Sequence, residues 1–78
     1  MAKISKNIKQ FRNENKMTQE ALAEKINVTR QTVSSWETDR TQPDIEMLEA
    51  LADTFGVGVE ELIYGKKNKV GLEPEKKP

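Results

Sequence analysis

The chain has 78 residues, of which 35% are hydrophobic and 33% charged, which is enough for one small core but not for two. It contains no cysteine and no histidine. This composition excludes a disulfide framework and a cysteine-based zinc site, and it removes the commonest general base and metal ligand. No apolar run approaches the roughly 20 residues that cross a bilayer, so we expect a cytoplasmic protein. We expect no cofactor.

The formal net charge is zero, but the charges are unevenly distributed along the chain. Residues 1–40 hold eight Lys or Arg and five Asp or Glu, for a net +3. Residues 41–65 hold six acids and no base, whereas residues 66–78 hold five lysines and two glutamates. A chain of this kind can present separate basic and acidic faces, so its zero total does not argue against binding to nucleic acid.

The first predicted helix has an apolar stripe at positions i, i+4 and i+7, formed by Ile4, Ile8 and Phe11. Asn15-Lys16 ends this pattern. Thr18 then offers a hydroxyl that caps a second helix. The buried stripe of that helix consists of Leu22, Ala23 and Ile26.

A third helix is predicted over roughly residues 30–38, close behind the second. Asn27 tolerates the left-handed conformation of a tight turn, and Thr29 can cap the new helix. The polar stretch 39–43, which ends in a proline, breaks it. Its buried side chains are those of Val33 and Trp36.

Asp44 is predicted to cap a fourth helix over roughly residues 45–54, which Gly56 stops. Its expected inward side chains are Ile45, Leu48, Leu51, Ala52 and Phe55. A short fifth helix fits residues 59–64, and residues 66–78 are interpreted as a charged flexible tail. The sequence thus predicts an all-α fold, a compact five-helix domain over residues 1–65.

The third helix has a small, polar outward face. Gln31, Ser35 and Thr38 lie opposite its buried side at i, i+4 and i+7. Compact polar side chains suit entry into a DNA major groove, where Gln pairs with adenine and Arg with guanine. An ordinary solvated helix face is the alternative, because polar outward faces are common.

Four segments resemble the Cro/repressor-type (Xre-like) helix-turn-helix family: NIKQFR at 7–12, MTQEALA at 17–23, VTRQTVSSWE at 28–37 and Pro43-Asp44. The resemblance covers about residues 4–64 and implies a lambda-repressor-like domain that binds DNA. The family usually has glycine where this chain has Lys16 and Asn27. Asparagine suits a left-handed position, whereas lysine suits it poorly.

The resemblance also implies roles for individual residues. It places five residues at or near base edges: Thr29, Arg30, Gln31, Thr32 and Ser35. It places a second group on the phosphate backbone: Gln19, Thr38, Arg40, Thr41 and Gln42. An amide at a helix N-terminus is a suitable anion ligand, which supports this role for Gln19.

Two further contacts are expected. The resemblance implies an ion pair between Arg12 and Glu37, which would fix the orientation of the third helix. A dimer contact is expected at the end of the domain, because the fifth helix has more apolar surface than so short a helix buries internally. Its residues are Val57, Val59, Leu62, Ile63 and Tyr64.

The leading functional hypothesis is a sequence-specific transcriptional regulator, a repressor that binds a palindromic operator on double-stranded DNA as a homodimer. The alternative is a protein-interaction module, either the antitoxin of a toxin–antitoxin pair or a regulator bound by a protein antagonist. In that case the acidic segment 44–61 or the tail makes the key contact. An enzyme is disfavoured, because exposed carboxylates on short helices lack a cleft that would shift their pKa.

Overall fold

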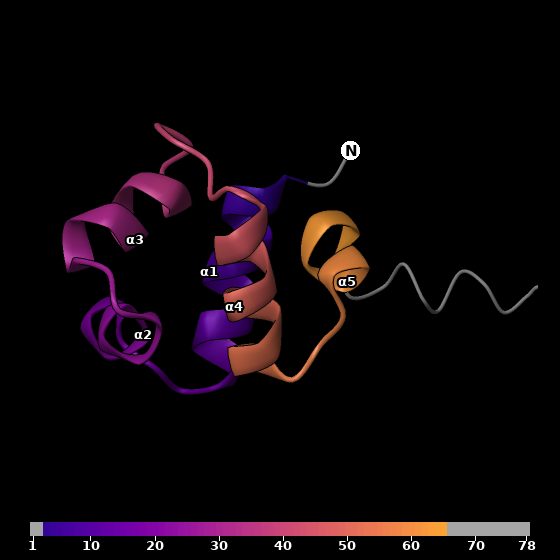
Figure 1. The fold of residues 1–78 in the computed structure, drawn as a ribbon, viewed down its shortest axis with the longest axis horizontal. Coiled ribbons are helices and arrows are strands. Elements are labelled where there is room, and N and C mark those ends of the chain that lie inside the picture. The colour runs from indigo at the N-terminus through magenta and orange to yellow at the C-terminus, as the bar shows by residue number, and fades with distance from the viewer. Residues whose placement is uncertain (1–2, 66–78) are drawn as a thin grey trace, which may run out of the picture.

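The computed structural model describes residues 3–65. They form five helices (Figure 1) and, within this range, no strand: α1 Ile4–Glu14, α2 Gln19–Ile26, α3 Arg30–Glu37, α4 Ile45–Phe55 and α5 Val59–Tyr64. The predicted all-α, five-helix class is confirmed. The predicted flexible tail at 66–78 lies outside the described residues. None of the described helices is long and apolar enough to span a bilayer.

The starts of three helices are fixed by side-chain caps that the sequence predicted. Thr18 Oγ1 accepts a hydrogen bond from the backbone N–H of Ala21 at 3.0 Å. Thr29 Oγ1 caps α3 in the same way at 3.1 Å, and Asp44 Oδ1 caps α4 at 3.0 Å. Each such cap contributes about 1 kcal/mol and defines where its helix begins.

The turns between helices use left-handed backbone conformations. Asn27 has φ of 66° and ends α2, and Gly56 has φ of 72° and ends α4. Lys16 and Asp39 also have positive φ, 58° and 64°. Lys16 therefore adopts the left-handed turn before α2 although it lacks the freedom of glycine.

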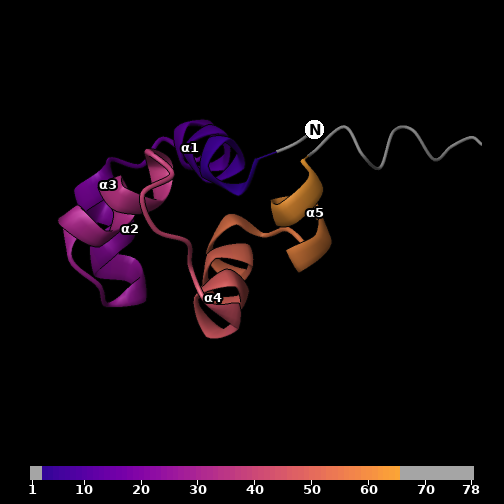
Figure 2. The ribbon, with the colours of Figure 1, turned by 90° about the horizontal axis from the view of Figure 1, so that it is seen from above.

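The core lies where α1 and α4 come between the α2–α3 pair and α5 (Figures 1 and 2). Five side chains in it are completely or almost completely buried: Ile8, Leu22, Val33, Leu51 and Leu62. The rings of Phe11 and Phe55 stack with centroids 5.8 Å apart, joining α1 to α4. The α2–α3 pair is thus at the opposite end of the molecule from α5.

The structure corrects the prediction for Ile45. Its side chain was expected to point inward, but it is 63% exposed. Ile45 is the first residue of α4 and directly follows the N-cap residue, Asp44. The buried stripe of α4 begins one turn later, at Leu48.

A buried polar side chain anchors α5. The Nδ2 of Asn7 on α1 donates hydrogen bonds to the carbonyl oxygens of Leu62 and Ile63, at 2.9 and 3.1 Å. These carbonyls belong to the last turn of α5, whose oxygens have no partner within the helix. Asn7 therefore supplies the hydrogen bonds that a six-residue helix cannot supply itself.

Candidate nucleic-acid interface

The helices α2 and α3 form a helix-turn-helix, with only residues 27–29 between them. The turn is closed by a hydrogen bond from the backbone N–H of Val28 to the carbonyl of Ala23, at 2.9 Å. On α3, Val33 and Trp36 are buried. The turn and these two anchors leave the opposite face of α3 at the surface.

The residues predicted to read bases lie on this surface to different degrees. Thr29, Arg30 and Gln31 are exposed, whereas Thr32 and Ser35 are half-buried. The Gln31 side chain forms no hydrogen bond to any part of the chain that the structure describes, so both its donor and its acceptor are available. The Thr29 hydroxyl, by contrast, already caps α3 and lies 2.9 Å from the hydroxyl of Thr32.

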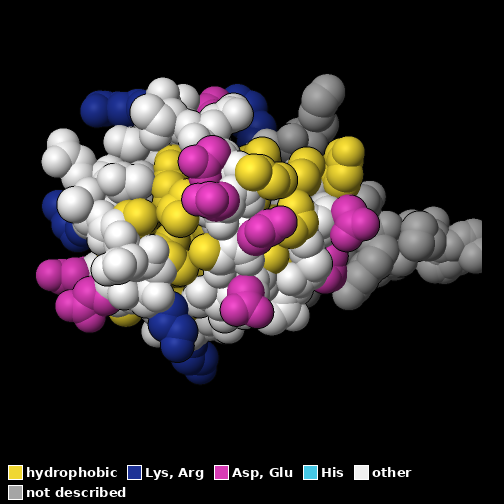
Figure 3. Space-filling view, in the orientation of Figure 1, with side chains coloured by type: hydrophobic (Ala, Val, Ile, Leu, Met, Phe, Trp, Pro, Cys, Tyr) yellow, Lys and Arg dark blue, Asp and Glu magenta, His cyan; other side chains and the backbone are white. Residues whose placement is uncertain are grey.

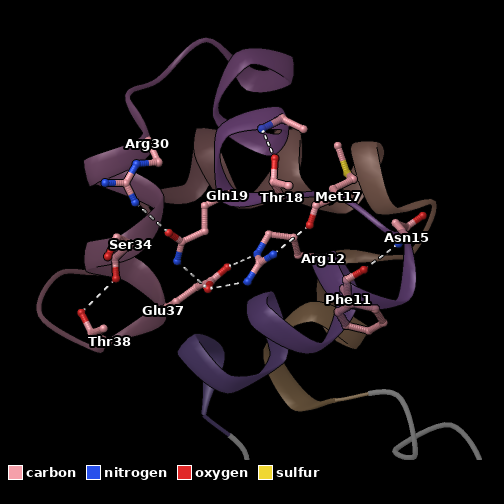
Figure 4. A network of polar contacts seen from close by, with 11 residues as sticks. Phe11, Arg12, Asn15, Met17, Thr18, Gln19, Arg30, Ser34, Glu37 and Thr38 are labelled. Atoms are coloured by element: carbon pink, nitrogen blue, oxygen red, sulfur yellow. Dashed lines mark hydrogen bonds and ion pairs between the residues drawn. The ribbon is translucent and has the colours of Figure 1, made fainter.

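A shielded ion pair joins α1 to α3, as the resemblance implied. Arg12 Nε lies 2.6 Å from Glu37 Oε2, and Arg12 Nη2 donates to Glu37 Oε1 at 3.1 Å. The two side chains are 11% and 3% exposed. Arg12 Nη1 also donates to the carbonyl of Met17, at 2.8 Å, so one guanidinium fixes α1, α3 and the turn before α2 (Figure 4).

Gln19, predicted to contact phosphate, belongs to the same network. Its Nε2 donates to Glu37 Oε1 at 3.0 Å, and its Oε1 accepts from Arg30 Nη1 at 3.3 Å (Figure 4). The sequence did not reveal this link, because the contact joins different helices and no periodicity reports on it. Gln19 is half-buried, and its position at the start of α2 still leaves that helix end open to an anion.

The loop after α3 contains the other residues predicted to contact phosphate. Arg40, Thr41 and Gln42 are exposed. Thr38 is exposed as well, but its hydroxyl donates to the carbonyl of Ser34 at 2.9 Å and closes the end of α3. The exposed Lys3–Asp39 ion pair, at 3.7 Å, links this loop to the start of α1.

Acidic side chains gather on one face of the domain. In the face of Figure 3, acidic side chains gather over α4 and α5, while Lys and Arg side chains lie at the edges. None of the four exposed acids on these helices is in an ion pair among residues 3–65: Glu46, Glu49, Asp53 and Glu60. Such a face would be repelled from phosphates.

The predicted dimer contact needs one correction. Leu62 has no exposed surface because it packs in the core, so it is unavailable to a partner. Tyr64 is 58% exposed, and Val57, Val59 and Ile63 are half-buried. The apolar surface around α5 is therefore smaller than the sequence suggested.

Comparison with known proteins agrees with this architecture. A family model described as helix-turn-helix matches residues 8–62. The chain is 38% identical over 60 residues to the immunity repressor protein of Bacillus phage phi105, and 33% identical over 64 residues to the HTH-type transcriptional activator BcrR of Enterococcus faecalis. These matches cover 77% and 82% of this chain but only 42% and 31% of the relatives.

Two solved structures with DNA are similar to the fold. The P22 c2 repressor bound to a synthetic operator has a TM-score of 0.78 at 27% identity, over 85% of this chain and 100% of that one. The SinR regulator in complex with DNA has a TM-score of 0.71 at 37% identity, over 76% and 95%.

The fold and the matched segment define a helix-turn-helix protein of the kind found in phage repressors. The chain belongs to the Cro/Xre-type helix-turn-helix family of DNA-binding transcription regulators.

Proposed function

We propose that this protein is a cytoplasmic repressor that binds a palindromic operator as a homodimer, with α3 in the major groove of each half-site. The observation that carries the proposal is the exposed polar face of α3, held against the body by a shielded Arg12–Glu37 ion pair. A recognition helix must be held rigidly if its side chains are to meet base edges in a fixed register.

The contacts divide into two kinds. The Gln31 side chain on α3 is exposed and has no hydrogen-bond partner among residues 3–65. Its amide N–H can donate to adenine N7, and its amide oxygen can accept from adenine N6. The N-terminus of α2 and the exposed loop residues Arg40, Thr41 and Gln42 are suited to phosphates on either side of the groove. Phosphate contacts fix the register, and base contacts supply the sequence preference.

The dimer follows from the length of DNA that one helix reads. A single recognition helix covers a few base pairs, whereas paired domains read half-sites about 34 Å apart. Tyr64, Ile63 and Val59 provide apolar surface at the end of the domain away from α2 and α3. We propose that this surface joins two copies on the operator.

The acidic face supports a second candidate function, a protein-binding module such as an antitoxin. Four exposed acids on α4 and α5 without ion-pair partners among residues 3–65, together with the exposed Ile45, suit a basic protein partner. A repressor whose activity an antagonist protein relieves would use the same face. DNA binding is the first choice because the relatives and the fold both point to it.

Selection of duplexes from a random DNA pool by the purified protein tests the proposal. We expect an enriched inverted repeat whose half-site centres are about 10 base pairs apart, bound by two chains. Enrichment of a single half-site bound by one chain would refute the dimer. No enrichment of any sequence would refute specific DNA binding.

A further inference from the structure

Acidic side chains form a regular row on the outer face of α4 (Figure 3). Glu46, Glu49 and Asp53 are exposed and follow one another at i, i+3 and i+7, the spacing of a single helix face. None of these three residues, the acidic row, forms an ion pair among residues 3–65. The side chain of Ile45, 63% exposed, lies one turn before Glu49 and adds apolar surface beside the row. The outer face of α4 therefore lacks a partner within the described domain.

Lysines form a second row, on the outer face of α1. Lys6 and Lys9 are exposed, lie at i and i+3, and have no ion-pair partner in the part of the chain that the structure describes. Glu14, the one acid of α1, is its last residue and accepts a hydrogen bond from Gln10. The outer face of α1 is therefore basic over its first two turns; we call Lys6 and Lys9 the basic row.

The two rows lie on opposite sides of the domain. The inner faces of α1 and α4 meet in the core, where the rings of Phe11 and Phe55 stack. The rows are on the far side of each helix from these rings. Accordingly, α4 lies in front of α1 in Figure 1, and the two helices are on opposite sides of the domain in Figure 2. One copy of the domain cannot pair its own rows, but two copies can.

The rows of two copies match in spacing as well as in charge. Residues three apart on a helix are separated by about 4.5 Å along its axis, so the two lysines of one copy can meet two carboxylates of the next. The aliphatic stems of the lysines can cover Ile45. The net charge of the chain is zero, so no overall repulsion opposes the approach of a second copy. We propose that copies of this protein associate head to tail, with the outer face of α1 of one copy against the outer face of α4 of the next.

This contact differs from the dimer proposed at α5. It joins two different surfaces, so it is heterologous and leaves an unpaired acidic row at one end and an unpaired basic row at the other. Exposed ion pairs are individually weak, so the contact alone forms small assemblies in free solution. Copies bound side by side on one duplex are at high effective concentration, where the same weak contact favours the filling of neighbouring sites together.

Sedimentation velocity of the free, full chain over a range of concentrations measures the contact without DNA. Between about 0.1 M and about 1 M NaCl the Debye length falls from about 10 Å to about 3 Å, so self-association should weaken several-fold. Lys6→Glu/Lys9→Glu and Glu49→Lys/Asp53→Lys each bring like charges together, so each variant alone should associate several-fold less than the parent. An equal mixture of the two should recover association, because each retains the intact face that the other has lost. Circular dichroism checks that both variants are folded.

Glu20→Lys/Glu24→Lys is the matched control. It makes the same change in net charge as the α4 variant, but at exposed residues of α2, and it should associate as the parent does. A parent chain that stays monomeric at low salt overturns the inference, as it would if the acidic row served a different basic protein. Self-association that neither α1 nor α4 reversal weakens, or that the α2 control weakens equally, also overturns it, and so does a mixture that stays unassociated. Because DNA is absent, none of these results bears on the proposed function.

Discussion

Removing one partner of the Arg12–Glu37 ion pair should destabilise the domain severely. In Arg12→Met the carboxylate of Glu37, 3% exposed, loses two of its hydrogen bonds and its only ion-pair partner among residues 3–65. Breaking a buried pair from one side costs about 3–5 kcal/mol, because a charge is left shielded and uncompensated. A domain of this length has roughly 4–12 kcal/mol of total stability, so the variant should be close to unfolding.

Urea unfolding followed by Trp36 fluorescence and far-ultraviolet circular dichroism measures the loss. Lys3→Met is the matched control, since the Lys3–Asp39 pair is 66% and 46% exposed and should contribute less than about 1 kcal/mol. The double variant Arg12→Met/Glu37→Leu should recover most of the stability. If Arg12→Met and Lys3→Met lower the free energy of unfolding by similar amounts, the Arg12–Glu37 pair is not shielded in solution.

Three further substitutions test the outward face of α3, the anchor of α5 and the dimer contact. Gln31→Ala should lose about 1–3 kcal/mol of discrimination between the selected operator and duplexes in which an adenine of the operator is replaced by another base, measured by competition binding. An unchanged ratio of the two affinities would show that Gln31 reads no base. Asn7→Leu should lower the urea midpoint by leaving two α5 carbonyls without their donor, and an unchanged midpoint would contradict the anchoring role. Ile63→Asp should reduce the binding of two chains to a full operator while preserving the fold, whereas unaltered two-chain binding would place the dimer contact elsewhere.

The positions of the helices followed from local chemistry in the sequence. Thr18, Thr29 and Asp44 act as caps through hydrogen bonds three residues along the chain, so a sequence pattern is sufficient to find them. Asn27 was predictable for the same reason, because its left-handed conformation is a preference of the residue itself.

Features that depend on packing between helices were not predictable in this way. Leu62 looked available because α5 is short, yet it is completely buried in the core, where α5 packs against α1 and α4. Ile45 looked buried because it continues an apolar stripe, yet the first turn of α4 extends beyond the core. The contact between Gln19 and Arg30 joins residues that the turn brings together, and only the three-dimensional arrangement shows it.

We propose that α3 and its flanking segments form the surface that meets DNA. Titration of the isotope-labelled protein with its selected duplex, followed by amide chemical shifts, tests this most directly. We predict that the largest shifts fall on residues 29–35, the start of α2 and the loop 38–42, with the acidic surface of α4 little affected. Shifts concentrated on α4 and α5, with residues 29–35 unchanged, would contradict it.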